Sequence, residues 1–142
     1  MPVTEGLPAA KYLFLVLLGG GLGAMMRLAL VRGAAHTWRD VWPWGIWVAN
    51  IGGALAAGAA VALISGVPEV TGNVLWWLLL VGFLGSLTTV SSFSLQTLQL
   101  FRKHGSGAAA INVLVSVGGC LAAATLGFLA VSLALNQGGG VL

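Results

Sequence analysis

Residues 82–94, which read GFLGSLTTVSSFS, decide how the third apolar segment of this chain folds. That segment covers about residues 74–101, which is longer than the roughly 20 apolar residues that one membrane-spanning helix needs. Gly permits non-helical backbone, and Ser and Thr side chains offer the backbone alternative hydrogen bonds. The stretch therefore predicts a transmembrane helix that is broken near its middle. Such breaks bind ions or substrates in transporters, whereas Ser- and Thr-rich segments in other proteins only pack against neighbouring helices.

The composition is that of an integral membrane protein. Of the 142 residues, 58% are hydrophobic and only 6% are charged, against about 25% in a soluble domain. The net charge of +3 comes from so few side chains that it gives no indication of nucleic-acid binding. Cys120 is the only cysteine, which excludes an intrachain disulfide and argues against a cysteine metal site. The N-terminus lacks a basic region, so we expect the first apolar segment to be a retained span rather than a cleaved signal.

Four apolar segments predict an all-α membrane protein with four transmembrane helices in a single domain of residues 1–142. The expected spans are about residues 12–31, 44–64, 74–101 and 108–135, with residues 102–105 as the loop between the last two. Tryptophans near Pro43 and at positions 76 and 77 are typical of the membrane interface. Runs of Gly and Ala in the spans predict close helix packing, which replaces the hydrophobic drive that lipid does not provide.

The polar groups within the predicted spans are neutral, apart from Arg27 near one boundary. No Asp, Glu, Lys or His lies there, although a proton-coupled exporter normally uses a carboxylate or His, and an enzyme needs a nucleophile with a base or metal ligands. We therefore expect no enzyme. Neutral donors without carboxylates favour an anion, because donors can replace its hydration shell while acids would repel it. The groups are Asn50, then Thr88, Thr89, Ser91, Ser92 and Ser94, then Asn112, Ser116 and Cys120 on one helix face.

Each of these groups also has a purely structural interpretation. Asn50 alone would be explained by an interhelical hydrogen bond worth roughly 0.6 kcal/mol, and the face that carries Asn112 by helix packing. Arg27 is either an arginine that anchors the first span at the membrane interface or part of an electropositive vestibule that attracts anions.

Taken in order, four motifs of this chain resemble the Fluc (CrcB) family of small fluoride channels over essentially its whole length. They are GGGLGAMMR, WPWGIWVANIGG, GFLGSLTTVSSFS and INVLVS. The resemblance implies an antiparallel, dual-topology dimer of four-helix subunits with two fluoride pores. It also implies a structural sodium ion (Na+) at the dimer interface, held by the backbone carbonyls of Gly85 and Thr88. It assigns Asn50 to the pore wall and Arg27 to the vestibule, and it places Asn112, Ser116 and Cys120 on a polar track beside the pore.

One position departs from the family pattern. The third-helix motif of the family usually reads TTFSTFS, with two Phe side chains around the ion path, whereas this chain has TTVSSFS. Phe93 keeps the second ring and Val90 replaces the first. The replacement removes a positively polarised ring edge that could face an anion.

Basic residues in the expected loops give a small orientation bias. Arg32, Arg39, Arg102 and Lys103 lie on one side and Lys11 on the other, so the positive-inside rule would place the two basic loops in the cytoplasm. A dual-topology homodimer inserts in both directions, while a one-way chain would pair with an oppositely biased paralogue. We favour the homodimer, because so small a difference acts only as a bias.

Together these features predict a channel that exports fluoride passively across the cell (inner) membrane, with lipid and a second copy as its other partners. Fluoride would lose its water, without covalent chemistry, against Asn50, Thr89, Ser91, Phe93, Asn112 and Ser116. One alternative is a small dual-topology multidrug or cation exporter, against which the missing carboxylate argues. The other is a non-conducting assembly subunit, which Val90 keeps open.

Overall fold

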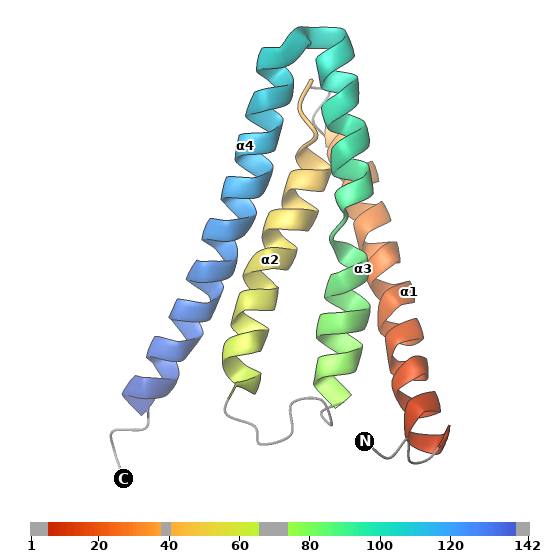
Figure 1. The fold of residues 1–142 in the computed structure, drawn as a ribbon, viewed down its shortest axis with the longest axis vertical. Coiled ribbons are helices and arrows are strands. Elements are labelled where there is room, and N and C mark those ends of the chain that lie inside the picture. The colour runs from red at the N-terminus through yellow and green to blue at the C-terminus, as the bar shows by residue number, and fades with distance from the viewer. Residues whose placement is uncertain (1–5, 38–40, 66–73, 139–142) are drawn as a thin grey trace.

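The computed structural model describes residues 6–37, 41–65 and 74–138, and the regular structure in these ranges is helical throughout (Figure 1). Helix α1 runs over Gly6–Thr37 and α2 over Trp44–Ile64. They are followed by a π-helix, η2, over Trp76–Leu84, by the short α3 over Gly85–Leu87, and by α4 over Val90–Gly138. The helix α1 extends beyond the first apolar segment at both ends. Arg39, which was counted in the orientation bias, lies outside the described residues.

Helix α4 bends back on itself at Gly105. This residue has φ 83°, a left-handed conformation that Gly adopts without the steric penalty of a Cβ. The first half of α4 (residues 90–104) and the second half (residues 106–138) therefore run in opposite directions (Figure 1). The prediction of a loop at residues 102–105 is wrong. Arg102, Lys103 and His104 are helical, and only Gly105 departs from helical geometry.

The helices are long and apolar enough to cross a membrane. Three such stretches lie in the described ranges, namely Ala9–Ala34, Trp44–Ile64 and Trp76–Gln137. The third has 62 residues, about three times what one crossing needs, and it contains the bend at Gly105. Large apolar side chains such as Leu13, Met25 and Leu114 face outward, as expected of a surface in contact with lipid.

The helices pack through small residues, as the sequence predicts. A Cβ added at Gly23 of α1 would collide with the carbonyl of Phe83. Likewise, a Cβ at Gly58 of α2 would collide with the carbonyl of Ala124 in α4. The backbones of neighbouring helices thus approach so closely that no larger residue fits between them, which is how helices associate where lipid offers no hydrophobic drive.

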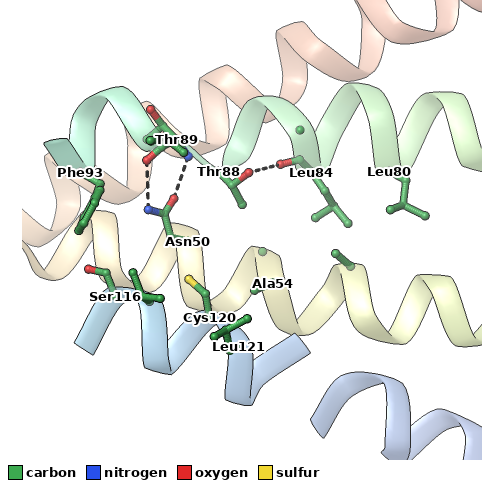
Figure 2. Close-up of a pocket in the computed structure, with 15 residues that line it drawn as sticks. Asn50, Ala54, Leu80, Leu84, Thr88, Thr89, Phe93, Ser116, Cys120 and Leu121 are labelled. Atoms are coloured by element: carbon green, nitrogen blue, oxygen red, sulfur yellow. Dashed lines mark hydrogen bonds between the residues drawn. The ribbon is translucent and has the colours of Figure 1, made fainter. Parts of the chain in front are cut away.

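The break predicted in the third apolar segment is confirmed by the backbone. Helix α3 ends at Leu87, Thr88 is extended with φ −81° and ψ 150°, and α4 begins at Val90. The nine-residue π-helix before the break was not predicted, since the sequence WWLLLVGFL carries no signal that distinguishes it from an α-helix. The break lies beside α2, so its backbone groups are next to the side chains of another helix rather than in lipid (Figures 1 and 2).

Candidate functional site

A cavity of about 790 Å³ surrounds the break (Figure 2). Its walls come from α2, the segment before the break and both halves of α4. None of the lining residues carries a charged side chain, and no group of three or more His, Cys, Asp or Glu lies in the described ranges. The polar members of the wall are Asn50, Thr88, Thr89, Ser116 and Cys120, and most of the remainder is apolar.

Asn50 of α2 holds the break through both ends of its amide. The backbone N–H of Thr89 donates to Asn50 Oδ1 over 2.8 Å, and Asn50 Nδ2 donates to the Thr89 carbonyl over 3.2 Å (Figure 2). The amide oxygen of Asn50 therefore replaces the backbone acceptor that an unbroken helix would supply to the Thr89 N–H, and the amide nitrogen adds a donor to the Thr89 carbonyl. Because Nδ2 carries two hydrogens, this pairing leaves one of them for another group.

Thr89 begins the helix that follows the break. Its Oγ1 accepts a hydrogen bond from the backbone N–H of Ser92 over 3.3 Å, the arrangement of an N-cap threonine. The same oxygen lies 3.0 Å from Ser91 Oγ. Ser91 is exposed and does not line the cavity. It can affect the site only through its hydrogen bond with Thr89, which does line the cavity.

Several backbone carbonyls lose their usual donors at the break, among them those of Gly85 and Thr88. In a continuous helix the Gly85 carbonyl would accept from the N–H of Thr89, and the Thr88 carbonyl from that of Ser92. Those two N–H groups instead bind Asn50 Oδ1 and Thr89 Oγ1. Gly85 and Thr88 both line the cavity. Carbonyl oxygens without helical donors are chemically suited to hold a small cation.

The wall opposite the break comes from the second half of α4. Ser116 is only 4% exposed, and its Oγ has no hydrogen-bond partner among the described residues. Cys120 lies one turn further on, and both residues line the cavity near Asn50 (Figure 2). Phe93, from the first half of α4, adds an aromatic ring to the same cavity. Two of the three polar residues expected on one helix face therefore reach the cavity.

Asn112, the third of these residues, lies in a closed network away from the cavity wall. It is 1% exposed, its Oδ1 accepts from Trp47 Nε1 over 2.7 Å, and its Nδ2 donates to Thr97 Oγ1 over 2.7 Å. Thr97 Oγ1 in turn donates to the Phe93 carbonyl over 2.8 Å. The partners Trp47 and Thr97 were missed in the sequence, although a buried indole usually finds an acceptor.

The structure brings together most of the residues that the resemblance and the proposed ion path assign to the pore or the sodium site, and leaves three of them outside the cavity wall. Those in the wall are Asn50, Gly85, Thr88, Thr89, Val90, Phe93, Ser116 and Cys120. Those outside it are Arg27, Ser91 and Asn112. Arg27 is half-buried on α1. Val90 is 78% exposed although it borders the cavity, so its side chain is largely uncovered within the single chain.

Fold and site together define a class: a multi-pass helical membrane protein with an uncharged, amide- and hydroxyl-lined cavity at a helix break. The model of one family, described as CrcB-like protein, Camphor Resistance (CrcB), matches residues 14–128. This match covers most of the chain, and the chain belongs to the CrcB family.

Curated relatives agree with this assignment. The "Fluoride-specific ion channel FluC 2" of Bradyrhizobium diazoefficiens is 41% identical over 115 residues, which cover 80% of this chain and 84% of the relative. A protein of the same name from Rhodopseudomonas palustris is 43% identical over 121 residues, or 83% of this chain and 91% of the relative. The "Fluoride-specific ion channel FluC" of Coxiella burnetii is 38% identical over 117 residues, or 81% and 93%.

Proposed function

We propose that this chain is a fluoride-selective channel that lets fluoride leave the cell passively across the cell (inner) membrane. One observation carries the proposal: in a cavity of this apolar helical protein, all the polar groups of the wall are neutral. An anion meets no carboxylate there, and a coupled transporter would normally need one. The names of the relatives, which are fluoride-specific ion channels, supply the identity of the anion.

Donors in the cavity wall would replace the water around fluoride. The second hydrogen of Asn50 Nδ2, the Ser116 hydroxyl and the Cys120 thiol are available for this. Phe93 offers a positively polarised ring edge without a full charge. The hydroxyls of Thr89 and Ser91 form a pair at the same end of the break. No covalent step is required.

A second copy of the chain would complete the pore. The cavity holds about 790 Å³, many times the roughly 30 Å³ of one water molecule, so a single chain leaves too much space to strip water from an ion. The exposed side chain of Val90 at the edge of this cavity is suited to contact with a partner. Close backbone approach through small residues suits an antiparallel pair. Four crossings per chain follow if residues 76–104, with the break between them, form one span and residues 106–138 form the next.

A sodium ion at the centre of such a pair would use the carbonyls at the break. The loss of their helical donors leaves the Gly85 and Thr88 carbonyls in need of partners. Two chains related by a two-fold axis would present four such oxygens. Ion-replacement crystallography should find a monovalent cation beside both residues, and a water molecule with ordinary hydrogen-bond distances there would contradict the sodium site.

Flux from liposomes tests the proposal. Purified protein in vesicles loaded with potassium fluoride or potassium chloride, with valinomycin to carry the counter-charge, should release fluoride and retain chloride. A fluoride electrode and a chloride electrode measure the two rates, and protein-free vesicles give the background. Equal rates for both ions would refute selectivity. The absence of flux of either ion would favour a non-conducting assembly subunit.

A further inference from the structure

A second cavity, of about 270 Å³, lies where the residues before α2 meet the end of the first half of α4. It shares no lining residue with the cavity at the break. Trp42 and Pro43 form one wall, and Gln96, Gln99, Lys103 and His104 of α4 form the other. It adjoins the bend at Gly105, the end of the molecule that lies opposite the ends of α1 and α4 at Gly6 and Gly138 (Figure 1).

The polar groups of this cavity favour a ligand that has both a negative charge and a hydrogen-bond donor. Gln96 Oε1 is buried and has no hydrogen-bond partner in the described part of the chain. An unpaired buried acceptor is costly, so a group that supplies a donor to it is favoured. Lys103, two turns further along α4, brings a positive charge to the same cavity and attracts an anion. The fitting ligand therefore carries an anionic group and a hydrogen-bond donor close together.

The surroundings place this cavity at the membrane surface. The rings of Trp42 and Trp47 stack at 5.7 Å, and Trp44 meets Trp47 edge-on at 5.1 Å. Tryptophans gather at the level of the lipid headgroups, and basic pockets between helices at that level bind them. The same half of α4 presents Leu98 and Phe101 outward, as a surface in contact with acyl chains would.

The geometry points to a binding site for a phospholipid headgroup that combines a phosphodiester with a hydrogen-bond donor, the chemistry of phosphatidylethanolamine. Lys103 binds the phosphate, and Gln96 Oε1 accepts from the ammonium group. Phosphatidylcholine has the same phosphate and net charge but a headgroup without a donor. The site therefore discriminates between the two lipids by hydrogen bonding rather than by charge. The site does not depend on fluoride conduction.

Native mass spectrometry of the purified full-length protein with short-chain lipids tests this site. Phosphatidylethanolamine should bind about fivefold more tightly than phosphatidylcholine, the factor expected from one net hydrogen bond. Gln96→Leu should abolish this preference, while Gln137→Leu, an exposed amide elsewhere on α4, should preserve it. Lys103→Ala should weaken both lipids about fivefold. Arg102→Ala removes the same charge from an exposed neighbour outside the cavity and should have a clearly smaller effect.

Three results would overturn the site. The first is equal binding of the two lipids by the unmodified protein, a result that does not depend on any variant folding. The second is an equal effect of Lys103→Ala and Arg102→Ala, which would indicate diffuse surface attraction. The third is binding of inorganic phosphate with the same dependence on Lys103 while neither lipid binds, which would make free phosphate the ligand.

Discussion

Two asparagines, Asn50 and Asn112, make side-chain hydrogen bonds between the apolar helices of this protein, and their surroundings differ. Asn50 borders a large cavity and binds one residue, Thr89, through both ends of its amide. Asn112 is fully buried and binds two side chains, Trp47 and Thr97, from two other parts of the bundle. One amide holds a backbone break open beside a cavity, and the other joins α2 and the two halves of α4 in a closed network.

The difference teaches that an asparagine in a membrane helix does not by itself mark an ion path. The two asparagines differ in whether the side chain still has a free hydrogen-bond donor that borders the cavity. Asn50 retains an N–H beside the cavity, whereas the amide of Asn112 has side-chain partners on both its oxygen and its nitrogen and does not reach the cavity wall. We therefore expect substitutions at Asn50 to alter conduction and those at Asn112 to alter stability.

Replacing Asn50 with Leu should have the largest effect. The N–H of Thr89 loses its partner, its C=O loses the hydrogen bond from Asn50, and the cavity loses a donor, so fluoride flux should fall about tenfold or more while the elution volume on size-exclusion chromatography stays the same. Asn136→Leu, an exposed position near the end of α4, is the matched control and should leave flux unchanged. Unchanged flux in well-folded Asn50→Leu protein would mean that this amide only packs.

Replacing Asn112 with Leu should lower stability more than conduction. The Trp47 indole and the Thr97 hydroxyl lose their partners, which should reduce the free energy of unfolding by roughly 1–3 kcal/mol. Thermal unfolding measures this loss, and Trp47→Phe in the same chain should recover part of it by removing the stranded donor. The ratio of fluoride to chloride flux in the folded fraction should stay the same. A changed ratio would place Asn112 on the ion path after all.

Ser116→Ala tests whether conduction and stability can be changed independently at a third position. Since Ser116 Oγ is buried and has no partner among the described residues, its removal should leave the unfolding temperature unchanged or raise it. Fluoride flux should nevertheless fall by roughly fivefold, the factor of one net hydrogen bond to the ion. Ser106→Ala, an exposed serine beside the bend, is the control for both measurements. A loss of stability without a loss of flux would group Ser116 with Asn112 instead.

Val90→Phe should have the smallest effect and should preserve or raise fluoride flux. The side chain is exposed in the single chain, so a ring meets little obstruction there, and it restores an aromatic edge at the cavity. Val90→Leu adds volume without a ring and separates the two contributions. A clear loss of flux with Phe but not with Leu would indicate that this pore wall does not use a ring at position 90.

The helical class and the break were predictable because their signals are local. A concentration of Gly, Ser and Thr within residues 82–94 marks the break, and the apolar composition marks the membrane protein. The partners of Asn112 were not predictable, because Trp47 is 65 residues away and the contact depends on how α4 turns at Gly105. The pairing of Asn50 with Thr89 was missed for a similar reason, since the two residues are 39 positions apart and meet only after packing.

The order of the chain has a consequence for how the protein is made. The helix before the break, residues 76–87, is too short to cross the bilayer by itself, and its end exposes backbone groups that lipid cannot satisfy. Synthesis runs from the N-terminus, so α2 with Asn50 reaches the membrane before Thr89 leaves the ribosome. The broken third segment is therefore synthesised when Asn50, which binds the backbone at the break, is already in the membrane. We expect membrane insertion of the third segment to depend on α2.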